Sequence, residues 1–339
     1  MPEQVIEKLT TSGDGEAAGS VAAGSVAAQI ADHFSLGQVR TVDPTPQGAN
    51  ANNVFLDTSD GRWVVRVDLA GSGGGQLLRE RFFARLIDEA TELRAPWPYR
   101  VDLTCNILPI PYAVMPRLPG ANLSWFEPHD WGAVGEALAI GARKLHASVW
   151  PEAAEWDAAT GEIRPSSIQE TDRVAGRAAK SCAKLDDGDN SLDGTSAQWL
   201  ADALAELDSG PAPTSTTLVH GDLVIENMTF SERDGAYDVI GVLDLEDARL
   251  GDPDQDIVRH IWWSCFAGQP AAAETFVATY VSSCQVSART RPYAVVDLLD
   301  VWEFGRSHGA DWFGGAQYFC DWARPLFADV DRILSHHGV

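Results

Sequence analysis

Between residues 38 and 68 the apolar and polar positions follow the pattern of β-strands, and a second pair of β-like runs comes later in the chain. The runs predicted to form strands are 54–56, 63–67, 99–104 and 112–115. Thr58 to Gly61, between the first two runs, has the residue types of a hairpin turn. Helical spacing, with apolar residues every three or four positions, occurs over 25–34 and 77–87.

The pattern changes after Pro116 to Gly120, where two prolines and a glycine break the last strand. From there helical periods dominate, and the predicted helices are 131–147, 166–184, 194–207, 254–268, 271–285, 293–308 and 316–336. One β-like stretch interrupts them at 217–244. The chain therefore predicts an α+β fold of two lobes. A loose tail over 1–24 precedes the two lobes, a small β-rich N-lobe over 25–117 and a larger, mainly helical C-lobe over 118–339.

Composition narrows the possible partners. The chain has 339 residues with 49 Asp plus Glu against 25 Lys plus Arg, a net charge of −24. Such a charge argues against nucleic acid and anionic membranes as partners, and suits either a cationic substrate or general solubility. The five cysteines are far apart, with no zinc or disulfide spacing. No signal peptide or run of about 18 apolar residues is found, so we expect a cytoplasmic protein, monomeric or dimeric.

The most informative stretch is His220 to Asn227. Asp222 and Asn227 have the spacing of a kinase catalytic loop, in which the Asp takes the proton of the acceptor hydroxyl and the Asn ligates magnesium. One short loop can position both groups for in-line transfer. By itself, a His-Gly-Asp triplet could equally cap a turn in any fold.

A downstream acid strengthens this hypothesis. The chain after Asn227 makes a turn and then a strand that ends at Asp244, so a hairpin would bring Asp244 back beside Asn227. Two oxygen ligands at strand ends suit a hard cation bound with ATP phosphates. Gly251-Asp252-Pro253 then leads into a helix that contains Asp256. Taken singly, each of these acids could be a helix cap or a solvated turn residue.

The two motifs LVHGDLVIENM (218–228) and VLDLEDARLGDPDQDIV (242–258) resemble the signature of the aminoglycoside phosphotransferase family, which has the protein-kinase-like fold. The resemblance covers about residues 33–330. It implies that Asp222 is the catalytic base and that Asn227 and Asp244 hold Mg²⁺. It further implies three residues that support the loop from its surroundings: His220, Asp252 and Asp256.

A kinase-like N-lobe also needs a phosphate-covering loop, a cation on a strand and a Glu on the next helix. The loop 48–53, with Asn52, is similar to the Gly-x-x-Asn loop of the family. Arg66 takes the position of the cation and Glu80 that of its partner. Each assignment has an alternative. The loop 48–53 could be an ordinary Asn-rich turn, Arg66 a charge on an edge strand, and Glu80 an exposed helix residue.

The adenine-binding hinge can be tested on the sequence. If Met115 is the gatekeeper, Pro116 supplies the C=O and Leu118 the N–H that read the base. Proline lacks an N–H but keeps its C=O, so this register satisfies the requirement. A shift by one residue would place Pro119 at the donor position and fail.

The acceptor is expected to bind near Asp222, where acidic side chains would bind amino groups. The acidic candidates are Glu226, Asp254, Glu303 and Asp311. Trp312, which is followed by Phe313 and two glycines, suggests an aromatic turn that lines a cleft. An aromatic wall would favour a nucleoside, macrolide or peptide-like acceptor over an aminocyclitol. Alternatively, the acidic candidates are solvated charges on helices and the aromatic residues belong to the core.

The sequence therefore predicts a Mg²⁺-dependent O-phosphotransferase that moves the γ-phosphoryl of ATP or GTP to a hydroxyl of a small molecule. The favoured acceptor is an antibiotic of aminoglycoside, nucleoside or macrolide type, whose phosphorylation gives resistance. One alternative is a metabolic kinase for choline, a sugar or an amino alcohol. An alternative of another class is an inactive nucleotide-binding module that regulates a partner.

Overall fold

The structure is a computed structural model that describes residues 25–45, 53–69, 71–150, 153–186, 191–210 and 216–339. The tail predicted over 1–24 lies outside the described residues. The chain divides into two compact units. Unit 1 comprises Met1–Pro119 with Gly241–Glu246, and unit 2 comprises Gly120–Ile240 with Asp247–Val339. Unit 1 is rich in strands and unit 2 is mainly helical, which confirms the predicted α+β class.

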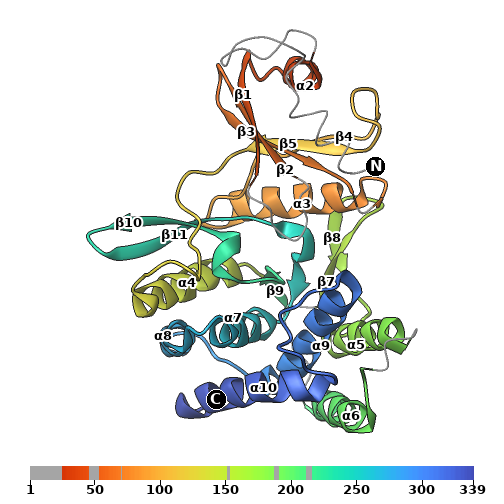
Figure 1. The fold of residues 1–339 in the computed structure, drawn as a ribbon, viewed down its shortest axis with the longest axis vertical. Coiled ribbons are helices and arrows are strands. Elements are labelled where there is room, and N and C mark those ends of the chain that lie inside the picture. The colour runs from red at the N-terminus through yellow and green to blue at the C-terminus, as the bar shows by residue number, and fades with distance from the viewer. Residues whose placement is uncertain (1–24, 46–52, 70, 151–152, 187–190, 211–215) are drawn as a thin grey trace. The chain divides into compact units, whose positions relative to one another are not determined.

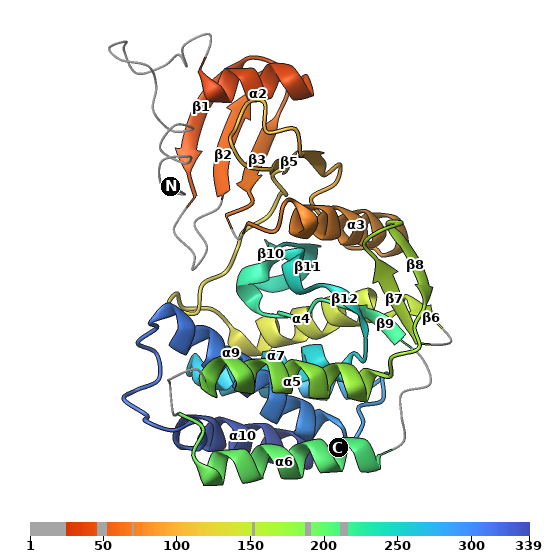
Figure 2. The same ribbon diagram turned by 90° about the vertical axis from the view of Figure 1, so that its right-hand side faces the viewer.

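Unit 1 contains a five-stranded antiparallel sheet in the order β1-β2-β3-β5-β4 (Figure 1). Its strands are β1 (Val39–Pro44), β2 (Asn53–Thr58), β3 (Arg62–Val67), β4 (Arg100–Asp102) and β5 (Tyr112–Pro116). The predicted hairpin forms, since the N–H of Thr58 donates to the Gly61 carbonyl at 2.9 Å and β2 pairs with β3. Helix α2 (Val26–Phe34) lies against this sheet (Figure 2). It buries Ala27 and Ile30 against strand residues such as Val54 and Val65, which forms the core of the unit.

Helix α3 (Gly75–Ala90) begins after a glycine-rich segment. Gly73 and Gly74 both adopt positive φ, a backbone conformation that glycine reaches without strain. The Asp68 carboxylate accepts hydrogen bonds from the Gly74 N–H at 2.7 Å and from the Ser72 hydroxyl at 2.9 Å. Asp68 directly follows β3, so this buried carboxylate ties the start of α3 to the end of that strand.

Unit 2 is a set of helices with short strands among them (Figures 1 and 2). The helices are α4 (Trp131–His146), α5 (Glu170–Asp186), α6 (Gly194–Ser209), α7 (Asp254–Phe266), α8 (Pro270–Val281), α9 (Thr290–His308) and α10 (Phe319–His336). Each of them was predicted, with ends that differ by a few residues. Helix α9 is central, because it packs against α5, α6, α7 and α10. Its Trp302 is fully buried and donates to the Ser191 hydroxyl at 2.9 Å.

The strands of unit 2 are short. A three-stranded sheet joins β6 (Val149–Trp150), β9 (Thr216–Val219) and β12 (Arg249–Gly251), and β7 (Ala154–Asp157) pairs with β8 (Glu162–Pro165). The remaining pair, β10 (Met228–Arg233) and β11 (Ala236–Val242), is the hairpin predicted after Asn227. The sequence did not indicate β6, β7, β8 or β12. None of the helices in the described ranges combines the length and apolar character that crossing a bilayer requires.

Helices α4 and α8 approach each other closely at Gly135, where an added Cβ would lie 2.2 Å from the backbone oxygen of Ala272. We expect Gly135→Ala to lower the free energy of unfolding by about 1–3 kcal/mol, because backbone atoms cannot move aside as a flexible side chain can. Urea-induced unfolding followed by tryptophan fluorescence measures this change. The matched control is Gly176→Ala in α5, where nothing lies within 4 Å and alanine should be neutral or stabilising. Equal stabilities of the two variants would contradict the expectation.

Candidate active site

Arg66 organises the polar centre of unit 1. It lies on β3 with 8% of its surface exposed, and its Nε is 3.1 Å from a carboxylate oxygen of Glu80 on α3. Its Nη2 also lies 3.2 Å from the Asp244 carboxylate and 3.0 Å from that of Glu246. The structure thus pairs Arg66 with Glu80, as the sequence suggests, and adds Asp244 and Glu246 to the same guanidinium.

The segment Gly241–Glu246 is anchored within unit 1. The N–H of Val242 donates to the Arg94 carbonyl at 2.9 Å, and the Gln76 side chain on α3 donates to Glu246 at 2.6 Å. Asp244 adopts a φ of 53°, in the left-handed region that few residues other than glycine, asparagine and aspartate visit. Its side chain is 40% exposed, so the carboxylate remains open to a further ligand.

Burial makes the electrostatics of this cluster strong. It raises the pKa of Glu80 despite the opposing charge of Arg66. Burial and the neighbouring Glu80 also raise the pKa of Tyr99, whose hydroxyl donates to Glu80 at 2.9 Å. Burial alone would lower the pKa of Arg66, but the carboxylates of Glu80 and Asp244 raise it well above its ordinary value. Three carboxylates around one guanidinium leave an excess of negative charge, which suits an additional cation with a preference for oxygen ligands.

The predicted hinge residues lie at the end of β5. Met115 is buried with 6% exposure, Pro116 is the last residue of the strand, and Leu118 follows it outside the strand. Asn52, predicted to cover the phosphates, lies outside the described residues together with most of the loop 48–53.

In unit 2 the segment that follows β9 is held by a buried carboxylate. The Asp256 side chain accepts the backbone N–H groups of His220 at 2.7 Å and of Gly221 at 2.8 Å. His146 on α4 lies 3.0 Å from the same carboxylate. Burial alone would raise the pKa of Asp256, but its hydrogen bond to His146 and the nearby His220 hold that pKa below its ordinary value. This arrangement fixes the backbone immediately before Asp222.

Gly221 is required at this point for two reasons. Its φ of 85° lies in the left-handed region, and a Cβ there would meet the Arg249 guanidinium at 2.4 Å and the Asp247 carbonyl oxygen at 2.5 Å. The N–H of Asp222 then donates to Nδ1 of His220 at 3.3 Å. His220 therefore supports the turn from within.

The structure brings Asp222 and Asn227 together. The Asn227 amide nitrogen donates to the Asp222 carboxylate at 2.8 Å and to its carbonyl oxygen at 3.0 Å. The amide oxygen of Asn227 is left available to a cation. The other Asp222 carboxylate oxygen lies 3.6 Å from Nε of Arg259, which is itself 3.1 Å from Asp297. Asp244 belongs to the other compact unit, where it contacts Arg66.

Arg259 was missed by the sequence reasoning. It lies on α7, three residues after Asp256, and residues with this spacing share one face of a helix. That spacing from a predicted loop-supporting acid is the signal that could have identified it. Burial alone would lower the pKa of Arg259, but Asp297 and Asp222 raise it.

Asp252 and Asp254 form the start of α7. Asp252 accepts the N–H of Asp254 at 3.1 Å, the Arg289 guanidinium at 2.9 Å and the Tyr293 hydroxyl at 3.1 Å. Asp254 is 2% exposed and accepts the backbone N–H of Ser287 at 2.9 Å. Burial and the charge of Asp252 raise the pKa of Asp254 to about 7. These contacts show that both acids stabilise the start of α7.

The acceptor candidates divide into two groups. Glu303 on α9 is nearly buried and pairs with Lys184 at 2.7 Å, so its charge is already balanced, whereas Asp311 is exposed. Glu226 belongs to the same loop as Asp222 and is open to solvent. Desolvation by the surrounding protein and the charge of Asp222 nevertheless raise its pKa, while the indole N–H groups of Trp125 and Trp263 act in the opposite direction.

Among the buried indole N–H groups of the described residues that make no hydrogen bond of ordinary length are those of Trp125, Trp263 and Trp312. The ring of Trp312 meets that of Trp263 edge to face at 6.4 Å. The neighbouring Phe313 packs instead against Trp302, at 4.4 Å between ring centroids. The sequence indicated Trp312 as an aromatic residue lining the acceptor cleft. It did not indicate Trp125 and Trp263 as partners of Glu226, because both residues are distant from Glu226 along the chain.

Residues 41–293, well over half of the chain, match the family model described as the phosphotransferase enzyme family, APH. The chain therefore belongs to this family, which confirms the resemblance carried by its two motifs. No curated protein is similar enough to the chain to count as a match.

Solved structures with the same fold include a thermostable mutant of aminoglycoside phosphotransferase APH(4)-Ia in a ternary complex with AMP-PNP and hygromycin B. It is 16% identical with a TM-score of 0.64, over 92% of this chain and 98% of that chain. Aminoglycoside 2′-phosphotransferase-IIIa in complex with GDP is 16% identical with a TM-score of 0.60, over 89% and 97%. Choline kinase LicA from Streptococcus pneumoniae is 18% identical with a TM-score of 0.56, over 91% and 98%. The fold is thus that of the protein-kinase-like small-molecule kinases, and family and fold together support a phosphotransferase.

The raised pKa of Asp254 predicts a pH-dependent contribution to stability. The folded protein binds the proton of this carboxyl more tightly than the unfolded chain does. The stabilisation is therefore complete below about pH 4 and is lost as the pH rises through about 7. We expect Asp254→Asn, which keeps an oxygen for Ser287, to be more stable than the wild type at pH 8 by on the order of 2–4 kcal/mol, because one pKa unit corresponds to about 1.4 kcal/mol.

Urea unfolding at pH 5 and pH 8 measures this difference, which should shrink at the lower pH. The control is Asp208→Asn at an exposed position of α6, where loss of the charge should have no pH-dependent effect. An Asp254→Asn variant with the same pH dependence as the wild type would contradict the prediction.

Proposed function

We propose that the protein is a Mg²⁺-dependent O-phosphotransferase that transfers the γ-phosphoryl group of ATP or GTP to a hydroxyl of a small molecule. The observation that carries this proposal is the pairing of Asp222 with Asn227 at 2.8 Å, in a loop whose backbone is held by Asp256. Catalysis of this kind depends on positioning and on neutralisation of charge, because the protein forms no covalent intermediate.

In this proposal Asp222 is the catalytic base. It orients the acceptor hydroxyl and takes its proton as the hydroxyl oxygen bonds to the γ-phosphorus and the bond to the nucleoside diphosphate breaks. The carboxylate is held on both sides, by the Asn227 amide at 2.8 Å and by the Arg259 guanidinium at 3.6 Å. A base held in this way loses little freedom when the acceptor binds.

The nucleotide half of the proposal rests on Arg66. Paired with Glu80, it binds the α- and β-phosphates, and Asn52 belongs to the loop that covers them. Pro116 and Leu118 read the adenine or guanine edge beside Met115. Asn227, through its amide oxygen, and Asp244, through its carboxylate, would each offer Mg²⁺ a ligand, and the ion would neutralise phosphate charge. The surplus of carboxylate around Arg66, and the exposure of Asp244, support a hard cation there.

The acceptor proposed for this site is a hydroxyl-rich, cationic small molecule, with an aminoglycoside-type antibiotic as the first choice and resistance as the consequence. Glu226 would bind an amino group, and the buried indole N–H group of Trp312, with those of Trp125 and Trp263 beside Glu226, would bind hydroxyl or ether oxygens. The structures with hygromycin B and with kanamycin among the solved neighbours support this class. Activity in the cytoplasm, as a monomer or dimer, stays part of the proposal.

A second acceptor class is favoured by the same residues. Aromatic rings beside a carboxylate also suit a compact cation such as an amino alcohol, and a choline kinase is among the structural neighbours. Nucleoside or macrolide acceptors would use the rings by stacking. An inactive regulatory module is disfavoured, because Asp222, Asn227 and Asp244 are all present.

We expect Asp222→Asn to lower kcat by at least a hundredfold while leaving nucleotide binding intact, because the base is lost and the shape is kept. The measurement is mass spectrometry of an acceptor panel incubated with Mg²⁺ and ATP or GTP, in which a substrate gains one phosphoryl group. The panel should include aminoglycosides, nucleosides, macrolides and amino alcohols, and chelation of Mg²⁺ should abolish the gain. Asp208→Asn is the control for loss of a surface charge. Equal turnover by Asp222→Asn and the wild type would show that Asp222 is not the catalytic base.

Arg259 is proposed as a positioning residue that acts through Asp222. We expect Arg259→Gln to lower kcat by about 10–100-fold with little change in KM for the nucleotide. Arg259→Lys, which keeps the charge beside Asp222, should restore kcat in part, again with little change in KM. A kcat in Arg259→Gln equal to that of the wild type would reduce Arg259 to a structural partner of Asp297.

A further inference from the structure

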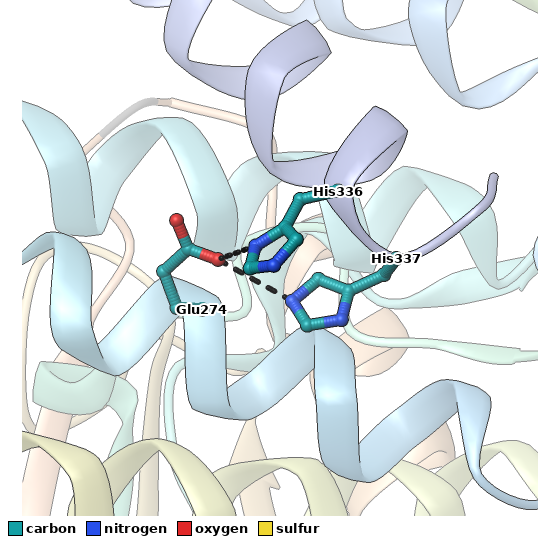
Figure 3. A group of neighbouring side chains, drawn as sticks. All are labelled: Glu274, His336 and His337. Atoms are coloured by element: carbon teal, nitrogen blue, oxygen red, sulfur yellow. Dashed lines mark hydrogen bonds and ion pairs between the residues drawn. The ribbon is translucent and has the colours of Figure 1, made fainter.

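Three side chains in unit 2 gather where helix α8 meets the end of helix α10 (Figure 3). One carboxylate oxygen of Glu274 lies 3.3 Å from Nδ1 of His336 and 3.3 Å from Nε2 of His337. All three potential ligand atoms lie within 4.8 Å of one another. None of the residues proposed for phosphoryl transfer belongs to this group.

Two adjacent histidines can converge here because the helix ends between them. His336 is the last residue of α10 and His337 is its C-cap, with φ −96° and ψ 9°. The two imidazoles consequently present different nitrogens to the same carboxylate, and their rings lie 4.8 Å apart at an angle of 33°. Glu274 comes from α8, so the group joins two helices that pack against each other.

The spacing fits a tetrahedral ion. Bonds of about 2.0–2.1 Å to nitrogen and oxygen place neighbouring ligand atoms about 3.3–3.4 Å apart in a tetrahedron. The two distances from Glu274 already have this value. The separation of the two histidine nitrogens, at most 4.8 Å, can close by small rotations of the imidazoles. Two imidazoles and one carboxylate form a donor set that binds zinc in preference to magnesium, and a fourth position is left for water.

The surroundings keep the carboxylate ionised and aimed. Arg332 donates to one oxygen of Glu274 at 2.6 Å, so the histidines alone contact the other oxygen, and a cation bound there would replace their hydrogen bonds to it. Burial alone would raise the pKa of Glu274, but the hydrogen bonds from Arg332 and the histidines hold it below its ordinary value. A partner that fixes a ligating carboxylate in this way is typical of zinc sites. The positive charge of Arg332 opposes the ion and limits the affinity to a moderate range.

We propose that Glu274, His336 and His337 form a structural site for a zinc-class divalent ion, which cross-links the end of α10 to α8. Helix α8 packs against α4 and α7, the helices that carry His146 and Asp256. Occupancy of the site therefore fixes the last helix onto the layer that supports the Asp222 loop. The site binds its ion independently of the acceptor and the nucleotide.

The test is titration of the full-length chain, without an affinity tag and after treatment with a chelator, with Zn²⁺ alone against a zinc-binding dye. We expect one site per chain and a zinc-dependent rise in Tm of several degrees, neither of which is reversed by excess Mg²⁺. His336→Gln, His337→Gln and Glu274→Gln should each weaken binding at least tenfold. His336 has a side chain that is 71% exposed, so its replacement leaves the fold intact.

The matched control is His308→Gln, an exposed histidine at the end of α9 that should leave zinc binding unchanged. Cobalt(II) provides a second readout, because a tetrahedral site gives intense visible bands that a six-coordinate ion lacks. These bands should vanish in Glu274→Gln. Absence of saturable zinc binding, or equal affinity in the three variants and the wild type, overturns the proposal. In that case the three residues are an ion-pair network only. Since no readout is catalytic, the result is separate from the fate of the proposed phosphotransferase activity.

Discussion

The organisation of unit 1 depends on one buried guanidinium. Arg66 contacts Glu80 on α3 and the carboxylates of Asp244 and Glu246, which lie 178 and 180 residues further along the chain. A buried charge that loses its partners costs several kcal/mol, so these contacts must form together. The strand, the helix and the returning segment are therefore coupled. A displacement of α3 would move Glu80 and with it Arg66, which contacts Asp244. It would also strain the hydrogen bond from Gln76 to Glu246.

In unit 2 a buried carboxylate, that of Asp256, organises the structure as Arg66 does in unit 1. Asp256 accepts two consecutive backbone N–H groups and contacts His146, and it lies in the first turn of α7, where the helix dipole favours a negative charge. The loop that carries Asp222 is consequently defined by main-chain hydrogen bonds, which a change of side chain elsewhere in the loop does not remove. Arg259, on the same face of the helix, extends this support to the Asp222 carboxylate itself.

Much of this could be predicted from the sequence, because the information is local. Asp222 and Asn227 lie within one loop, the β2–β3 hairpin has its turn residues, and the helices of unit 2 have a clear apolar period. The features that the sequence did not predict are strands too short to show a period and contacts between distant segments. Strands β6, β7, β8 and β12 have two to four residues, too few for a period to appear. The role of Glu303 as an acceptor residue stays a prediction, and its ion pair with Lys184 at 2.7 Å joins α9 to α5, two segments that no local pattern relates. The contacts of Glu246 with Arg66, and of Trp125 and Trp263 with Glu226, join distant segments that no periodicity relates.

The choice of arginine at position 66 has a consequence for chemical labelling. A planar guanidinium can meet several carboxylates at once, and it stays protonated at any pH the protein tolerates, so it is not a nucleophile. The sequence contains no lysine between Lys8 and Lys144. Nucleotide analogues that carry an amine-seeking electrophile, which acylate the strand lysine of many kinases, would find no primary amine on the sheet of unit 1. Covalent probes for this enzyme must therefore be directed at other side chains.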